Sequence, residues 1–340
     1  MPSLREILEK APPEQSPDHP GGALPTRLAG AIDDSIAYLN SPAAAESLAK
    51  DPYWPKWNSP WWHVLLFNEM GMAESLPSKT IESIAGALAQ YYLKCFPSRE
   101  EDVPAGIDPL NQIPCHCQLG TIEQVFQSCG KEGDPRLNWL SDWYLNYQLP
   151  DGGLNCDESA YNKAEPKSSI VSTLPPMEAL LARENLSASE VSCLDRGAQY
   201  LLERKLHCRK NSDQVIDQNF LQLAFPRFYH YDILRGLSFI VAWAKKLSRP
   251  LPVAQISEVI LLIDGKFPDG HLKVERQVFT NCQSRFPGEA GEAWHKGEAT
   301  SFPLLEAVSQ IGEDSPFLTA KWATIKRDLQ HLERANLLHT

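Results

Sequence analysis

Apolar residues recur every three to four positions along most of the chain, whereas strict alternation of apolar and polar residues is nearly absent. Six segments carry a single apolar stripe, which predicts amphipathic helices in a surface layer. They cover residues 24–40, 79–96, 136–149, 192–206, 254–267 and 319–338. Five other segments are apolar on more sides, which predicts helices in the interior. These cover residues 60–71, 117–130, 168–181, 229–243 and 299–312.

The two kinds of segment alternate, and the interior set recurs at intervals of roughly 50 to 70 residues, which is typical of a repeat architecture. The turn LPDGGL at 149–154 has an echo in FPDGHL at 267–272. We therefore predict an all-α fold, an α/α toroid in which about five to six helical hairpins close into a ring with inner and outer helix layers. A single toroid domain covers residues 26–340, after a flexible, Pro-rich N-terminal lead-in over residues 1–25.

The first of these turns also carries a resemblance to known proteins. Alternating helical hairpins with such turns are similar to the terpenoid cyclase and protein prenyltransferase β-subunit superfamily. The residues that carry the likeness are Trp143, Gln148, Pro150, Asp151, Gly152 and Gly153. The segments 168–181 and 225–237 resemble inner-helix starts of squalene-cyclase-like single toroids. The resemblance implies a toroid around a central substrate cavity, and it does not fix the reaction.

Differences from the superfamily's motifs limit the reactions that the chain is expected to catalyse. The chain has no D-x-D-D acid run, so it is not a squalene–hopene cyclase of that type. Protein prenyltransferases bind zinc through a D-x-C pair and a histidine, and no such D-x-C pair occurs here. The run Cys115-His116-Cys117 nevertheless stands at a comparable inner-helix start, and it resembles the C-H-x-G zinc run of lanthionine cyclases, with its glycine, Gly120, placed later.

Composition excludes several other classes. The net charge of −11, with no basic stripe to offset it, argues against a nucleic-acid partner. No run approaches the roughly 18–20 apolar residues of a transmembrane segment, and the N-terminus lacks the layout of a secretion signal. The eight cysteines form no dense framework, which predicts reduced thiols and a cytoplasmic protein.

The cysteine-rich run is the candidate metal site. In a toroid the N-termini of the inner helices face one mouth of the cavity, and their dipoles favour anions and thiolates. Cys115, His116 and Cys117 therefore predict a Zn²⁺ site with Cys156 or His230 as the completing ligand, because thiolate and imidazole are the ligands zinc prefers. The alternative is that no cofactor binds and these cysteines are small core residues.

The candidate catalytic residues lie near two other helix starts and are Asp232, His230, Tyr231, Asp157 and Cys156. Asp232 or Asp157 would protonate a hydroxyl or an alkene, and His230 or Tyr231 would shuttle the proton. In the structural alternative Asp232 caps a helix, His230 packs in the core and Asp157 lies in a polar surface loop. The candidate substrate-binding residues are Trp61, Trp62, His63, Tyr229, Ser169 and His295. Trp61 and Trp62 are adjacent, so at most one of them lines the cavity.

Together these observations favour a terpenoid-cyclase-like enzyme. Its substrate would be small and mostly apolar, an isoprenoid or another natural product, and it would undergo cyclisation, dehydration, isomerisation or hydration by acid–base chemistry, with or without zinc. One alternative is a non-catalytic toroid that binds a ligand or a partner. Another is an α/α-barrel carbohydrate-active enzyme, which needs two carboxylates across a groove, here Asp157 and Asp232. The sequence does not indicate an oligomeric state.

Overall fold

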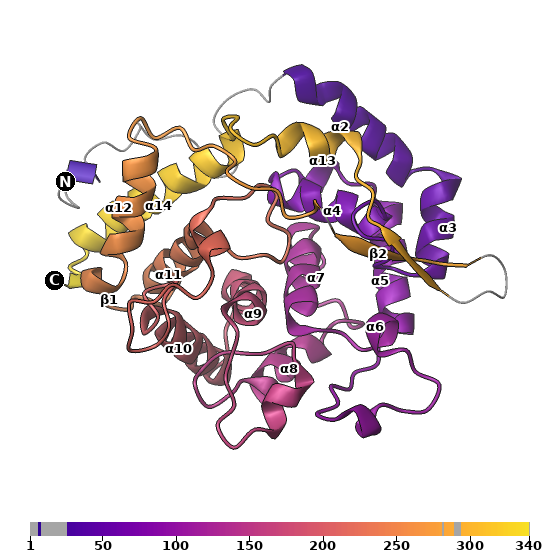
Figure 1. The fold of residues 1–340 in the computed structure, drawn as a ribbon, viewed down its shortest axis with the longest axis horizontal. Coiled ribbons are helices and arrows are strands. Elements are labelled where there is room, and N and C mark those ends of the chain that lie inside the picture. The colour runs from indigo at the N-terminus through magenta and orange to yellow at the C-terminus, as the bar shows by residue number, and fades with distance from the viewer. Residues whose placement is uncertain (1–5, 8–25, 281, 289–293, 340) are drawn as a thin grey trace.

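The computed structural model describes residues 6–7, 26–280, 282–288 and 294–339 of the 340-residue chain. These residues are mostly helical, as the periodicity predicts (Figure 1). The helices are α2 (Thr26–Leu39), α3 (Pro42–Lys50), α4 (Pro60–Glu69), α5 (Ser78–Tyr91), α6 (Pro109–Gln112), α7 (His116–Ser128), α8 (Trp139–Tyr147), α9 (Ile170–Ala182), α10 (Ala188–Leu202), α11 (Ile233–Leu247), α12 (Ser257–Lys266), α13 (Pro303–Val308) and α14 (Pro316–Arg334). The predicted lead-in over residues 1–25 lies outside the described residues apart from Glu6 and Ile7.

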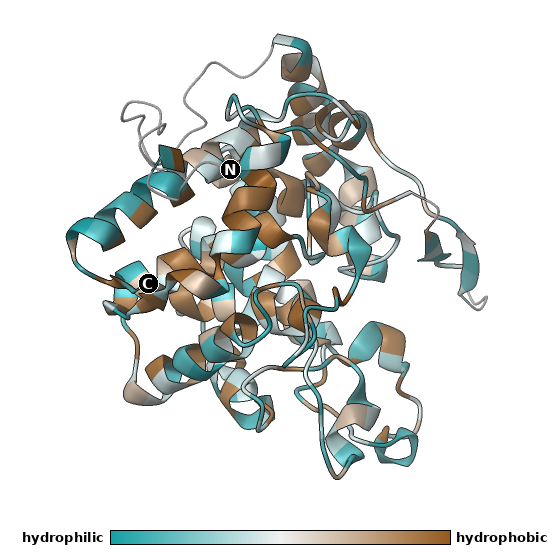
Figure 2. Cartoon of the chain, turned by 60° about the vertical axis from the view of Figure 1, so that its left-hand side comes forward, coloured by the Kyte–Doolittle hydropathy of each residue, from teal (hydrophilic) through white to brown (hydrophobic). Residues whose placement is uncertain are grey.

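Four short strands accompany the helices. The strands β1 (Leu251–Pro252) and β4 (Leu338–His339) pair in parallel, and β2 (Gln283–Phe286) pairs with β3 (His295–Glu298) as an antiparallel hairpin. The hairpin projects from the helical body and is mostly hydrophilic, whereas the apolar helices gather inside (Figure 2).

The apolar helices form a continuous series of neighbours. Contacts join α4 to α7, α7 to α9, α9 to α11 and α11 to α14, and the more polar helices α8, α10 and α12 pack against this series. Figure 1 shows α9 near the middle of the molecule with α7, α8, α10 and α11 around it. In this series α4, α7, α9 and α11 bury residues on several sides, whereas α14 buries one stripe.

The two echoing turns have the same hydrogen bonds to the helix that follows. After the first turn, the Leu154 N–H donates to Thr173 Oγ1 of α9 over 2.8 Å, and its carbonyl accepts from the cap residue Ser169. After the second turn, the Leu272 N–H donates to Thr319 Oγ1 of α14 over 2.9 Å. The Leu272 carbonyl accepts from Ser315, which caps α14. The repeat in the sequence is therefore also a repeat in the structure.

This equivalence corrects one sequence-based assignment. The segment 299–312 was expected to supply an interior helix, but it forms only the short α13, which packs against α2. The segment 319–338 was expected in the surface layer, yet α14 follows the second turn as α9 follows the first, and it packs against α11. The physical reason is that α14 buries a long apolar stripe, which includes Leu318, Trp322, Ile325 and Leu329.

The helices α7 and α9 approach each other unusually closely, because a glycine meets two prolines at their contact. A Cβ added at Gly120 would lie 2.2 Å from the Pro175 carbonyl carbon and 2.3 Å from the Pro176 nitrogen. Both prolines lie inside α9, and Gln124 Nε2 donates to the Pro175 carbonyl over 2.9 Å. The close contact holds the N-terminal parts of the two helices side by side.

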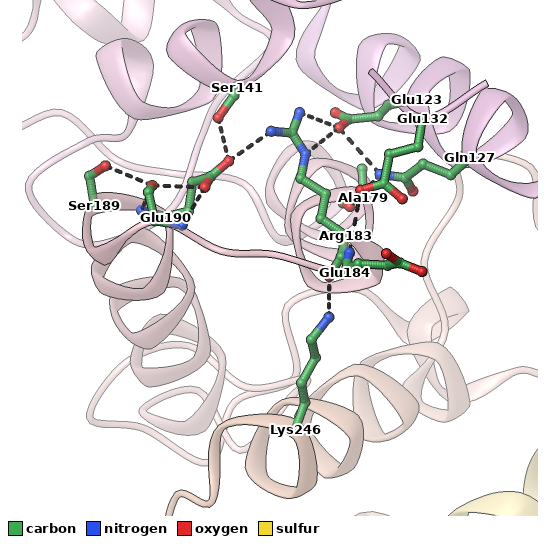
Figure 3. Close-up of polar contacts among 11 residues, drawn as sticks. Glu123, Gln127, Glu132, Ser141, Ala179, Arg183, Glu184, Ser189, Glu190 and Lys246 are labelled. Atoms are coloured by element: carbon green, nitrogen blue, oxygen red, sulfur yellow. Dashed lines mark hydrogen bonds and ion pairs between the residues drawn. The ribbon is translucent and has the colours of Figure 1, made fainter. Parts of the chain in front are cut away.

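A half-buried arginine at the C-terminal end of α9 ties four helices together (Figure 3). Arg183 Nε donates to Glu123 of α7 over 2.7 Å, and its Nη1 lies 2.7 Å from Glu190 of α10. Glu190 also accepts from Ser141 of α8 over 2.6 Å. Both carboxylates are buried, so each depends on Arg183 for a compensating charge.

Candidate metal centre

Three cysteine sulfurs meet where the N-terminal ends of α7 and α9 lie side by side. Cys115 is the N-cap residue of α7 and Cys117 lies in its first turn, while Cys156 comes from the loop before α9. The Sγ atoms of Cys115 and Cys117 are 3.2 Å apart, and those of Cys117 and Cys156 are 3.6 Å apart. All three lie within 4.8 Å of one another. The structure thus brings Cys156 to the predicted cysteine pair.

The turn 149–154 delivers Cys156 to this position. Gly152 has φ +95°, which favours glycine, and a Cβ there would lie 2.4 Å from the Arg196 carbonyl oxygen. The Leu149 N–H donates to the Gly153 carbonyl over 2.8 Å and closes the turn. Beyond it, the Cys156 N–H donates to Ser172 Oγ of α9 over 3.0 Å. The loop is therefore anchored to the helix that follows it.

The three thiols differ in the direction of their pKa shifts. Hydrogen bonds from Cys115 and Cys117 hold the pKa of Cys156 well below its ordinary value. The hydrogen bonds with Cys115 and Cys156, together with burial, raise the pKa of Cys117. Although its bond to Cys117 opposes the change, contact with Cys156 and burial raise the pKa of Cys115. The Cys117 N–H also points at the Cys156 sulfur over 3.5 Å, a contact that favours negative charge on Cys156.

The donor set fits a zinc ion. Zinc–sulfur bonds of about 2.3 Å in tetrahedral geometry place the sulfurs about 3.8 Å apart. The observed separations of 3.2 and 3.6 Å, and a third of no more than 4.8 Å, need shifts of about 1 Å or less to reach that value. Among the described residues no fourth histidine, cysteine or carboxylate joins the cluster. Such a site would offer three protein ligands and one open position, which is the pattern of catalytic zinc.

His116 is not part of this cluster, contrary to the sequence-based expectation. Its side chain is buried, its Nδ1 accepts from Trp143 Nε1 over 2.9 Å, and its Nε2 lies 3.0 Å from the Tyr161 hydroxyl. Burial lowers the pKa of His116 to about 4, so the ring is neutral at pH 7. Both ring nitrogens are occupied, and His116 instead fixes the packing of α7 against α8.

An aromatic cluster with one lysine lies beside the thiols. Lys56 Nζ donates to the Tyr229 hydroxyl over 2.8 Å. It also lies 5.3 to 5.5 Å from the ring centroids of Tyr53, Trp54, Trp57 and Tyr229. Burial lowers the pKa of Lys56, and ionisation of Cys115 and Cys117 would oppose that shift. Burial also raises the pKa values of Tyr53 and Tyr229, and ionisation of the same two cysteines would raise them further. The cluster is therefore close enough to the thiols to respond to their ionisation.

His230, predicted as a catalytic residue, and Trp62, predicted to bind substrate, both belong to this cluster. The His230 ring stacks on Tyr229 at a centroid distance of 4.6 Å. Burial lowers the pKa of His230 to about 4, and no described residue gives its Nε2 a hydrogen-bond partner. Trp62 packs on Trp57 with ring centroids 4.3 Å apart, whereas Trp61 is buried in the core.

Other predicted site residues have structural roles. Asp232 is fully buried and accepts from the Arg235 and Ala224 N–H groups, so it caps α11. Tyr231 is buried and donates to the Leu206 carbonyl over 2.6 Å. Asp157 is exposed and caps the short 3-10 helix Glu158–Asn162, and Ser169 caps α9. All four side chains form hydrogen bonds with backbone groups. Asp232 is buried and Asp157 is exposed, so the two carboxylates do not face each other across a groove.

Two further substrate-binding candidates, His63 and His295, have other neighbours than the cysteine cluster. His63 stacks on Phe302 with ring centroids 3.6 Å apart, and burial lowers its pKa to about 3. His295 is exposed on β3 and stacks on Phe286, because the chain forms a hairpin there instead of a helix start.

Sequence reasoning missed Lys56. Of the aromatic run that contains it, the sequence analysis singled out Trp61 and Trp62 as substrate-binding candidates, but not the lysine. A lysine surrounded in sequence by Tyr, Trp and Pro was the available signal, since such a residue sits among rings when the run folds back on itself.

Comparison of the chain with models of protein families, with curated proteins and with solved structures finds no match. Within the described part of the chain, no helix is both long and apolar enough to cross a membrane.

Proposed function

We propose that the chain is a zinc-assisted enzyme that converts a small, mostly apolar substrate beside the Cys115–Cys117–Cys156 cluster. The observation that carries the proposal is the meeting of three sulfurs within 4.8 Å at two helix N-termini. We also propose that the two helix layers close into the α/α toroid expected from the resemblance to terpenoid cyclases, with this cluster at one mouth. The series of neighbouring apolar helices from α4 to α14 supports that architecture.

Zinc held by three thiolates would polarise or deprotonate a water, hydroxyl or thiol group bound at its open position. The helix N-termini favour the negative charge that the thiolates bring. The rest of the site consists of this chain's own residues.

The aromatic cluster would bind the apolar body of the substrate. The rings of Trp54, Trp57 and Tyr229 surround the Lys56 amine, and ring faces stabilise a cation by about 0.5–2 kcal/mol. The aromatic surface therefore suits apolar substrates better than carbohydrates.

His230 is the residue best placed to accept a proton. Because its pKa is about 4, the ring is neutral at pH 7 and its Nε2 is free to act as a base. The Tyr229 ring, whose hydroxyl accepts from Lys56, stacks on that imidazole. A positioned acid–base group of this kind contributes about 10²–10⁴-fold in rate.

Metal analysis tests the proposal. Protein purified without added chelator should contain about one zinc per chain, as expected for one three-cysteine site. Cys117→Ser should lose the metal, while Cys129→Ser, a matched change at the C-terminal end of the same helix, should keep it. Equal zinc in both variants, or none in the wild type, would contradict a metal at this cluster.

Turnover then tests the chemistry. Zinc-loaded protein should convert members of a panel of linear isoprenoid alcohols, with products detected by mass spectrometry. His230→Phe should slow the reaction at unchanged zinc content. A panel that gives no product with metal-loaded protein would contradict the substrate class.

A further inference from the structure

The amine of Lys56 lies inside the aromatic cluster, and the proposed zinc chemistry gives it no part in a reaction. Four rings surround its nitrogen at centroid distances of 5.3 to 5.5 Å, those of Tyr53, Trp54, Trp57 and Tyr229. Tyr229 comes from the segment before α11, so only the folded chain encloses the amine. Lys56, Tyr53, Trp54 and Tyr229 are all half-buried, so solvent still reaches this group of side chains.

The Lys56 amine has fewer hydrogen-bond acceptors around it than it has protons. A lysine ammonium carries three N–H donors. Among the described residues the Tyr229 hydroxyl is its one acceptor, over 2.8 Å, and no described carboxylate forms an ion pair with it. The ring faces stabilise the positive charge, but they do not replace the acceptors that water would provide. The site therefore favours a cationic nitrogen with one proton over an ammonium with three.

Lys94 shows that contact with a ring does not by itself create this environment. Its amine lies 5.6 Å from the centroid of one ring, that of Trp139, and its side chain is exposed. Water can therefore accept the protons of the Lys94 ammonium. At Lys56, by contrast, burial lowers the pKa of the amine, so more of it is uncharged and nucleophilic at pH 7 than in an exposed lysine.

We propose that Lys56 binds a small, apolar aldehyde covalently as an iminium. The lysine nitrogen attacks the carbonyl carbon, a C=N bond replaces the C=O bond, and the carbonyl oxygen leaves as water with two protons of the ammonium. The iminium keeps the positive charge that the rings stabilise. It also keeps one N–H, for which the Tyr229 hydroxyl is the acceptor. The four rings that surround the nitrogen pack against the hydrocarbon part of an apolar aldehyde.

This reaction goes beyond the proposed zinc chemistry, although it takes place in the same aromatic cluster. Iminium formation consumes the aldehyde and the amine and releases water, so it needs no metal, oxidant or reductant. Labelling of Lys56 is therefore expected to be the same in untreated protein and in protein treated with EDTA. A protein without zinc that still reacts at Lys56 would contradict the metal centre and support the iminium.

Trapping the iminium with sodium cyanoborohydride tests the inference. The reagent adds hydride to the iminium carbon and leaves a stable secondary amine. Digestion and mass spectrometry then give the rate of hexyl addition from hexanal at each lysine. At pH 7 Lys56 should react at least about tenfold faster than Lys94, because its amine is desolvated and the Lys94 amine is not. Glycolaldehyde, which is polar but forms iminium ions in the same way, should show a smaller preference for Lys56.

Two matched substitutions test the rings. Trp54→Ala opens the cluster to water and should slow hexyl addition at Lys56 at least about threefold, because water then hydrates the ammonium. Trp139→Ala removes the ring beside Lys94 and should leave the rate at Lys56 as in the wild type. Circular dichroism of both variants confirms that each is folded before labelling.

Three results with wild-type protein would overturn the proposal: hexyl addition at Lys56 no faster than at Lys94, faster addition at another lysine, or an equal preference for Lys56 with glycolaldehyde and with hexanal. An unchanged rate in Trp54→Ala would contradict the part assigned to the rings. The first three results come from the unmodified chain, so they do not depend on whether a variant folds.

Discussion

Replacing Gly120 by alanine should destabilise the protein and disturb the cysteine cluster together. The added Cβ would lie 2.2 Å from the Pro175 carbonyl carbon, 2.3 Å from the Pro176 nitrogen and 2.6 Å from the Pro175 carbonyl oxygen. Ordinary contacts begin near 3.4 Å, so α7 and α9 must separate by more than 1 Å. All three atoms belong to backbone, which cannot rotate away as a side chain can.

The expected cost follows from two opposing effects. Overpacking a well-packed contact costs about 1–3 kcal/mol, and here the clash with rigid backbone favours the upper part of that range. Alanine is a better helix former than glycine by about 1 kcal/mol, which offsets part of the cost. We expect a net loss of about 1–2 kcal/mol in the free energy of unfolding, together with weaker zinc binding because Cys115 and Cys117 move with α7 away from Cys156.

Gly86→Ala is the matched control. Gly86 is exposed in the middle of α5, and nothing lies within 4 Å of the position of its Cβ. The same substitution should therefore stabilise the protein by about 0.5–1 kcal/mol and leave zinc affinity unchanged. Urea denaturation measures the stabilities, and competition with a chromogenic chelator measures the zinc affinities. If Gly120→Ala matched the stability and zinc affinity of the wild type, the close approach of α7 and α9 would be refuted.

Three further results are expected. Arg183→Met should lower the free energy of unfolding, measured by urea denaturation, by about 3–5 kcal/mol, because it leaves Glu123 and Glu190 buried without a counter-charge. Adding Glu123→Gln to this variant should restore part of the loss. If the effects of the two substitutions on stability simply added, the network would be contradicted. Zinc binding at pH 7 should release protons, because zinc binds thiolates and the pKa values of Cys115 and Cys117 are raised. Calorimetry in two buffers of different ionisation enthalpy measures the number of protons released, and a value near zero would show that the thiols are already ionised. His63, with its pKa lowered to about 3, binds a proton in the unfolded chain before it does in the folded one, so its contribution to stability is present above about pH 6.5 and is lost as the pH falls toward 3. Protonation of His63 should account for about 2 kcal/mol of the stability lost between pH 7 and pH 5. His63→Leu should reduce the fall in the free energy of unfolding over this range by that amount. An unchanged dependence of stability on pH would contradict the burial of the ring.

The helices of the interior set were largely predictable because their apolar residues cover more than one face. The periodicity placed α4, α7, α9 and α11 close to their observed positions. It failed at α13 and α14, since α14 carries charged residues on a face turned to solvent and its apolar stripe resembles that of a surface helix. Only the hydrogen bonds of Leu272 to Thr319 and Ser315 identify α14 as the counterpart of α9, and these are tertiary contacts.

The cysteine cluster was predictable in part for a similar reason. The run at the helix start pointed to Cys115, His116 and Cys117, and Cys156 was one of the two residues, with His230, named as the completing ligand. The direction of His116 was not predictable, because it depends on whether Trp143 and Tyr161 reach its two ring nitrogens. Likewise, an aspartate such as Asp232 is suited to catalysis, but its position immediately before α11 lets it accept hydrogen bonds from backbone amides instead.

The matching hydrogen bonds after the two Asp-Gly turns show that the helical framework is the same at both places, although the chain between turn and helix differs in length. Fourteen residues, 155–168, lie between Leu154 and the cap residue Ser169, whereas the corresponding segment 273–314 contains β2, β3 and α13. Because loop-closure entropy grows only logarithmically, a threefold longer insertion costs about 1 kcal/mol. The longer insertion also reaches the aromatic cluster, where Ser284 of β2 accepts from the Lys56 N–H over 2.8 Å. Evolution can therefore remodel the segment beside the aromatic cluster by insertion and deletion while the turns, caps and helices that hold the cysteines stay as they are.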